Sequence, residues 1–104
     1  MGMQKSVQFS DAGPSWPAIL EQFTQRGITP SLRMIDAMPA FPDEIPEPNW
    51  KELRLGFATG MVTIRREGSQ WSCIVWGNAE AELLAAQSLV CEVIAAAGNG
   101  SICD

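Results

Sequence analysis

The side chains best suited to bind a ligand are three arginines in predicted strands. Arg54 and Arg65 lie on two neighbouring strands, and Arg33 lies on a third. If Leu53 and Leu55 face the helices, the two-residue period of a strand directs Arg54 to the opposite face of the sheet. Guanidinium groups bind carboxylates and other anions through paired hydrogen bonds. A small anion is therefore one candidate ligand, although a solvated arginine face is the more frequent outcome of such a pattern.

Histidine is absent, which removes many kinds of active site. Ser-His-Asp and Cys-His catalysis and histidine-bound zinc are excluded. Cys73 falls in a strand rich in Trp and Val, where a cysteine acts as a small buried hydrophobe. Cys91 lies on a helix, Cys103 lies near the end, and no CxxC spacing occurs. We expect no catalytic residue, no metal and no cofactor.

The segment Pro39–Pro48 contains four prolines and is expected to be an extended loop. Its three carboxylates, those of Asp43, Glu44 and Glu47, lack the D-x-D-x-D-G spacing of a calcium loop. We therefore expect a solvated, semi-rigid loop and not a metal site. Phe41 and Ile45 would be available there for contact with a partner.

Periodicity predicts two helices and five strands. The first helix is capped by Ser15 and ends at Gly27, and its apolar stripe comprises Trp16, Ile19, Leu20 and Phe23. The second helix starts at Asn78 and ends at Gly98. The strands cover residues 7–9, 32–37, 52–57, 61–66 and 71–76, and residues 98–104 form a flexible tail. Short turns between the last three strands indicate an antiparallel meander.

This order, β-α-β-β-β-β-α, predicts an α+β fold: a two-layer sandwich of one antiparallel sheet and two helices. The order of elements resembles the TATA-binding-protein-like unit, in which a curved sheet carries helices on one side. The resemblance covers most of the chain, rests on topology alone and implies nothing about DNA binding. With 104 residues, 46% of them hydrophobic, residues 1–104 form a single domain. The net charge of −5 argues against a nucleic-acid surface.

Two tryptophans on one predicted strand point to opposite faces of the sheet. Trp71 and Trp76 differ by an odd number of positions on one strand, so one faces the core and the other faces outward. The sequence does not determine which. An exposed tryptophan beside the outward Met61 would form an apolar patch of the kind found at interfaces. Arg33 joins this face if Ile35 points outward.

The second helix offers another apolar surface. Its core stripe comprises Leu83, Ala86, Val90, Val93, Ile94 and Ala97. Leu84 and Cys91 project elsewhere, within about 20° of each other at 100° per residue. Two apolar surfaces on one small acidic domain favour self-association. The candidate interface or ligand residues are Arg33, Arg54, Met61, Arg65, Trp71, Trp76, Leu84 and Cys91.

Three functions follow in order of preference. The first is a non-enzymatic homo-oligomeric interaction module, expected as a homodimer. The second is a small-molecule binding protein with a groove between sheet and helices lined by Trp and Arg. The third is an enzyme with Cys or carboxylate chemistry, which ranks last because no carboxylate pair falls in a catalytic motif. An odd number of cysteines and the lack of an apolar leader or membrane run indicate a cytoplasmic protein.

Overall fold

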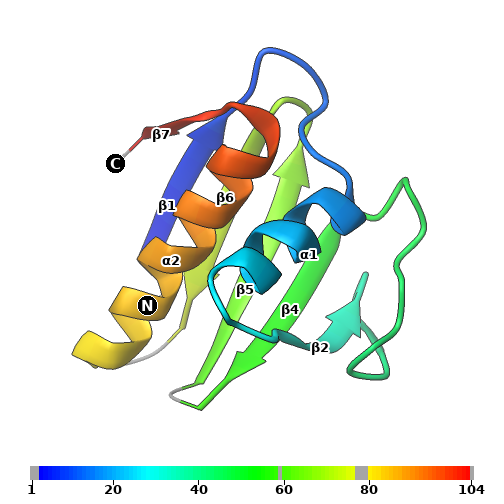
Figure 1. Ribbon diagram of the computed structural model, residues 1–104, viewed down its shortest axis with the longest axis vertical. Coiled ribbons are helices and arrows are strands. Elements are labelled where there is room, and N and C mark those ends of the chain that lie inside the picture. The colour runs from blue at the N-terminus through cyan, green and yellow to red at the C-terminus, as the bar shows by residue number, and fades with distance from the viewer. Residues whose placement is uncertain (1–2, 59, 77–79, 104) are drawn as a thin grey trace.

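The chain folds as one antiparallel sheet with two helices on the same face, as the computed structural model shows (Figure 1). The structure describes residues 3–58, 60–76 and 80–103. The elements are β1 (Met3–Gln8), α1 (Trp16–Gln25), β2 (Ser31–Ile35), β3 (Met38–Pro39), β4 (Glu52–Phe57), β5 (Gly60–Glu67), β6 (Gln70–Val75), α2 (Ala81–Gly98) and β7 (Ser101–Cys103). The predicted α+β class with an antiparallel sheet is confirmed.

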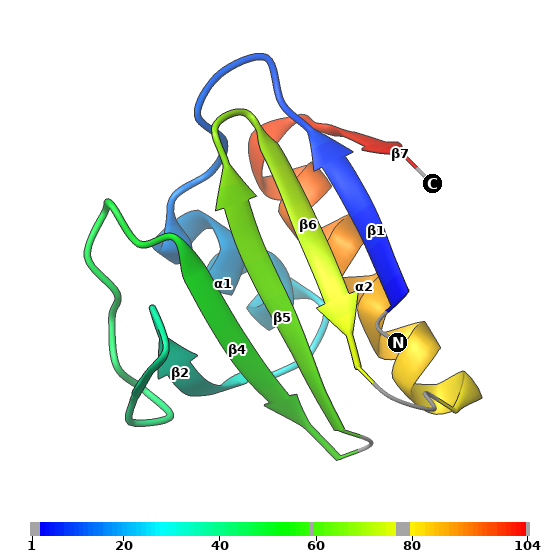
Figure 2. The ribbon, with the colours of Figure 1, turned by 180° about the vertical axis from the view of Figure 1, so that it is seen from behind.

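The sheet has the order β3-β2-β4-β5-β6-β1-β7 within the described residues. Strands β4, β5 and β6 form the predicted meander. Strand β2 pairs with β4 on one side of it, and β1 pairs with β6 on the other. Both helices cover one face, whereas the reverse view shows the strands with no helix in front of them (Figure 2). The sheet thus has one covered face and one open face.

Two short strands depart from the predicted order of elements. After β2, Asp36 and Ala37 adopt positive φ angles of 49° and 67° and form a two-residue hairpin turn into β3. After α2, Asn99 is left-handed at φ 55°, which turns the chain back toward β1. In place of a flexible tail over 98–104, residues Ser101–Cys103 therefore pair with β1 as β7.

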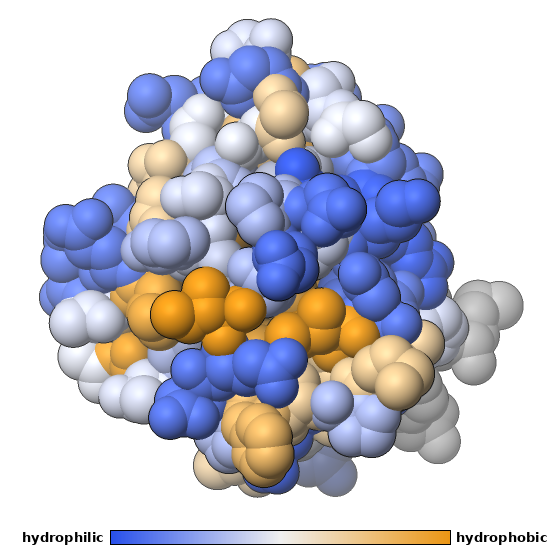
Figure 3. Space-filling view, turned by 90° about the vertical axis from the view of Figure 1, so that its right-hand side faces the viewer, coloured by the Kyte–Doolittle hydropathy of each residue, from blue (hydrophilic) through white to orange (hydrophobic). Residues whose placement is uncertain are grey.

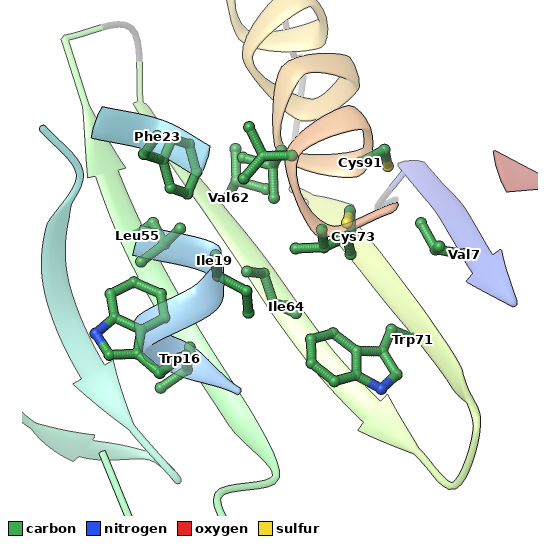
Figure 4. Close-up of a cluster of buried hydrophobic side chains, with 14 of the residues drawn as sticks. Val7, Trp16, Ile19, Phe23, Leu55, Val62, Ile64, Trp71, Cys73 and Cys91 are labelled. Carbon is green, nitrogen blue, oxygen red and sulfur yellow. The ribbon is translucent and has the colours of Figure 1, made fainter. Parts of the chain in front are cut away.

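The hydrophobic core fills the space between the helices and the covered face. Leu53, Leu55, Val62 and Ile64 are fully buried from β4 and β5, as the alternation predicts. Side chains from α1, α2 and the sheet meet in one cluster (Figure 4), whose labelled members are Val7, Trp16, Ile19, Phe23, Leu55, Val62, Ile64, Trp71, Cys73 and Cys91. The open face therefore carries the alternate residues of each strand.

Helix α1 begins and ends as predicted. Ser15 is the N-cap and its hydroxyl accepts from the backbone N–H of Ala18. Trp16, Ile19 and Phe23 are buried on the core side. Leu20, predicted in the same stripe, is 38% exposed. The buried face of α1 is therefore narrower than predicted and includes the other three residues only.

Helix α2 buries a wider face than the one predicted. Val90, Val93 and Ile94 are buried as expected, but Cys91 is also fully buried and Leu84 packs against the core. The expectation that Leu84 and Cys91 form a separate outward surface is therefore wrong. The helix is apolar over a wide part of its circumference, so one side of this apolar surface packs against the sheet and the other packs against α1. The predicted cap Asn78 lies outside the described residues.

Helix α2 is the one helix of the described residues long and apolar enough to cross a membrane, with a mean hydropathy of 1.4 over Ala81–Gly98. The sequence prediction looked for an uninterrupted apolar run, which Glu82 and Glu92 prevent. In the fold, α2 lies along β1, β5 and β6 and contacts α1. Its buried residues are Gln87, Val90, Cys91, Val93 and Ile94, so one side of the helix belongs to the core of a compact fold.

Candidate functional site

Polar and apolar side chains are ordered in rows across the open face of the sheet. One row runs from Met34 through Arg54, Thr63 and Ile74 to Gln4, as the strand registers define it. A second row contains Glu52, Arg65, Ser72 and Ser6. Arginines thus lie toward the β4 side of each row, and neutral polar residues lie toward the β1 side.

The structure decides between the two tryptophans of β6. Trp71 is fully buried on the helix side, and Trp76, just after β6, is 53% exposed. Met61 is 47% exposed at the adjoining end of β5. Trp71 is therefore not available as an interface residue, because parity and the fit of its indole against Phe9 direct it into the core.

The three candidate arginines lie on the open face in different environments. Arg65 forms an ion pair with Glu52, with 2.9 Å between Nη2 and Oε1. Arg54 has no ion-pair partner among the described residues. Arg33 lies against Gly56, where an added Cβ would come within 2.6 Å of its Nε.

A β-bulge explains how Arg33 reaches this face. The pairing of β2 with β4 shifts between Leu32 and Met34. Leu32 and Ile35 therefore both face the core although they are an odd number of residues apart. In a regular strand Arg33 could face outward only if Ile35 did so too. The extra residue of the bulge removes this condition, so Arg33 faces outward while Ile35 faces the core.

A second cluster, which the sequence analysis missed, surrounds Arg66 at one end of the covered face. Its guanidinium carbon lies 4.8 Å from the ring centroid of Trp50 and 5.2 Å from that of Trp71. The two indoles contact each other edge to face at 5.2 Å. Arg66 Nη1 also donates to the carbonyl oxygens of Pro48 and Trp50. The sequence analysis did not consider Arg66, which the two-residue period of β5 directs to the side of the sheet opposite Arg65.

A cavity of about 510 Å³ opens beside this cluster. Its walls come from the turn before α1, the start of α1, the proline-rich segment and the end of β5. They include Pro14, Trp16, Ile45, Pro48, Trp50 and Arg66. The cavity thus lies at one end of the sandwich, and its wall contains Trp16, Trp50 and Arg66 and none of the tryptophans and arginines named as candidates.

Two cysteines meet inside the core, where α2 crosses β6 (Figure 4). A hydrogen bond with the Cys91 thiol, followed by burial, raises the pKa of Cys73 well above its usual value. Because the thiolate is the nucleophile, this environment keeps Cys73 unreactive in the folded state. Cys103 is exposed on β7.

The acidic loop carries hydrogen bonds of its own. Glu44 Oε1 accepts from the N–H of Phe41 at 3.2 Å, and the N–H of Glu44 donates to the carbonyl oxygen of Phe41. Within residues 3–58, 60–76 and 80–103, no three His, Cys, Asp or Glu side chains come together as metal ligands. The loop instead presents Phe41 and Ile45 to solvent.

No family model, curated protein or solved structure matches the chain. The arrangement of its own residues therefore carries the functional argument. It offers two places where another molecule can bind: the open sheet face with Met61 and Trp76, and the cavity beside Arg66.

Proposed function

We propose that this protein is a non-enzymatic interaction module that forms a homodimer through the open face of its sheet. The observation that carries the proposal is the exposure of Trp76 and Met61 at one end of that face. Large apolar side chains that remain exposed on a small domain are typical anchors of interfaces. The half-buried Met34 adds an apolar side chain to the neighbouring row of the same face.

The charges on the face favour one orientation of the two copies. A two-fold axis parallel to the strands, between β5 and β6, places the β4 side of one copy over the β1 side of the other. Arg54 then meets Gln4 of the second copy instead of a second Arg54. Within one chain these residues are three strands apart in the same row, about 14 Å at the usual strand spacing.

The size of the face is compatible with a dimer that uses all of it. Five strands from β2 to β1, each about six residues long, cover on the order of 500 Å² in projection. Protruding side chains raise the accessible area toward the roughly 800 Å² per subunit of a stable complex. The dimer therefore needs the whole face, and loss of one anchor should dissociate it.

Analytical ultracentrifugation of the wild type and Trp76→Ala tests this proposal. We expect a dimer for the wild type at high micromolar concentration and a monomer for the variant, with unchanged circular dichroism. A wild type that sediments as a monomer at that concentration would refute the proposal.

Charge complementation tests the orientation. Gln4→Glu should tighten the dimer because the new carboxylate meets Arg54 of the second copy, and Gln4→Lys should weaken it. Combining Gln4→Lys with Arg54→Glu should restore association. Gln25→Glu makes the same change in charge on an exposed site of α1 and serves as the matched control. Equal effects of Gln4→Glu and Gln25→Glu would rule out this axis.

Two further parts of the proposal concern topology and location. Without the short edge strands β3 and β7, the elements follow the order β-α-β-β-β-β-α, which supports a TBP-like topology as a likeness of fold. The buried thiols of Cys73 and Cys91 suit the reducing cytoplasm. Neither argument implies nucleic-acid binding, and the net charge of −5 opposes it.

A further inference from the structure

The cavity beside Arg66 has the size and lining of a small-molecule site. Its volume of about 510 Å³ falls within the roughly 300–1,000 Å³ that is usual for ligand pockets. Prolines and tryptophans form much of its wall, and these rigid side chains lose little conformational entropy when a ligand binds. Figure 3 views the side of the molecule on which β2, the proline-rich segment and the start of α1 lie, and hydrophobic residues form a band there between hydrophilic ones.

Arg66 supplies a positive charge that the protein does not neutralise. Its Nη1 is bound to two backbone carbonyl oxygens, which fixes the guanidinium group against Trp50 and Trp71. Arg66 has no ion pair with any carboxylate in the described part of the chain. The donors Nε and Nη2 have no protein acceptor there either. A fixed guanidinium with two remaining donors is suited to hold an anion.

The start of α1 adds to this electrostatic preference. Ser15, Trp16 and Pro17 line the cavity, and the first turn of the helix contains no acidic residue. The partial positive charge of the helix N-terminus therefore reaches the same space as Arg66. Glu47 is the one carboxylate among the residues that line the cavity, and it lies on the proline-rich segment.

We propose that this cavity binds a small organic anion, an apolar ring system that carries one carboxylate or sulfonate group. The ring lies against the proline and tryptophan side chains, and the anionic group binds Nε and Nη2 of Arg66. This site is separate from the open sheet face and does not depend on the dimer: Arg66 and Trp71 pair with each other on the covered side of the sheet.

A pair of dyes that differ in charge tests the proposal. The anion 8-anilinonaphthalene-1-sulfonate and its neutral analogue N-phenyl-1-naphthylamine share the same ring system. We expect the anion to bind folded protein with one site per chain and at least tenfold more tightly than the neutral dye, a difference of about 1.4 kcal/mol. Trp16, Trp50 and Trp71 lie at or next to the cavity, so quenching of tryptophan fluorescence provides a second readout.

Variants on the loop locate the binding site without disturbing the core. Ile45 lines the cavity and is 73% exposed, whereas Phe41 is 75% exposed on the same loop and does not line it. Ile45→Asp should weaken binding of the anion about tenfold, as expected for an added like charge and a lost apolar contact, and Phe41→Asp should leave it unchanged. Glu47→Gln should tighten binding because it removes a negative charge from the wall.

Arg66→Gln tests the charged group directly. It should remove the preference for the anion over the neutral dye, and thermal unfolding shows whether the variant is folded. If Arg66→Gln does not fold, the effects of Ile45→Asp and Glu47→Gln on anion binding test the proposal instead. Equal affinity for both dyes would overturn the proposal. So would anion binding that is lost in Trp76→Ala but kept in Ile45→Asp, because the dye would then occupy the open sheet face.

Discussion

The side-chain amide of Gln87 donates a hydrogen bond to the backbone carbonyl oxygen of Cys73, with 2.8 Å between Nε2 and the oxygen. Both residues are buried, so the bond joins α2 to β6 inside an otherwise apolar contact. A polar group in such a place fixes the rotation of the helix, because any other rotation would bury the amide unpaired. This explains why Cys91, one helical turn further on, faces the sheet as well.

The first prediction concerns this bond. Gln87→Ala should lower the free energy of unfolding by about 2–3 kcal/mol, because it removes a buried hydrogen bond and leaves a small cavity. Urea denaturation followed by circular dichroism measures the change. Gln25→Ala, on the exposed side of α1, should change stability by less than about 0.5 kcal/mol. Equal effects of the two substitutions would contradict this role of Gln87.

The second prediction concerns the hairpin turn between β2 and β3. Ala37 is held at φ 67°, a left-handed conformation that costs a residue with a Cβ roughly 1 kcal/mol. The side chain is exposed, so Ala37→Gly should stabilise the protein by about 0.5–1 kcal/mol. Ala96→Gly, at an exposed site in α2, is the matched control and should destabilise by about 1 kcal/mol. Destabilisation by both would mean that Ala37 is not strained.

Local pattern predicted most of the fold but not where the chain deviates from ideal geometry. Ser15 and the alternation of Leu53 and Leu55 indicated α1 and β4 correctly, because each signal depends only on near neighbours. The turn at Asp36 and Ala37 lacks the glycine that marks such hairpins, so β3 was missed. The bulge at Arg33 likewise has no signal in the sequence.

The candidate sites show the same limit. The two-residue period of a strand showed that either Trp71 or Trp76 is exposed. Only the register of β6 shows that the exposed residue is Trp76. The cavity beside Arg66 depends on the proline-rich segment lying across the end of the sheet near Trp50, a contact between distant parts of the chain. For α2, the sequence assigned Leu83 to the core and Leu84 to the outside, whereas both pack against the core because the sheet and α1 together cover a wide arc of the helix.

The third prediction concerns thiol reactivity. Cys103 is exposed, whereas Cys73 and Cys91 are buried in the core. Treatment of the folded protein with 5,5′-dithiobis(2-nitrobenzoic acid) at pH 8 should therefore label one thiol rapidly, and all three only after denaturation. Mass spectrometry after brief labelling identifies the modified residue. Rapid labelling of Cys73 in the folded protein would show that the region where α2 crosses β6 opens readily.

The fourth prediction gives the dependence of stability on pH. The hydrogen bond with Cys91, together with burial, raises the pKa of Cys73 in the folded state above that of the unfolded chain, which is about 8.5. Between the two pKa values the unfolded state has lost a proton that the folded state keeps. The contribution of Cys73 is therefore full below pH 8 and falls as the pH rises further, by up to about 1.4 kcal/mol per unit.

Cys73→Ala isolates this contribution. The substitution has a packing cost that does not vary with pH, so the difference in unfolding free energy between wild type and variant should shrink from pH 8 to pH 10. Urea denaturation in the presence of tris(2-carboxyethyl)phosphine measures it without disulfide formation. A difference that stays constant over this range would mean that Cys73 ionises as readily in the folded protein as in the unfolded chain.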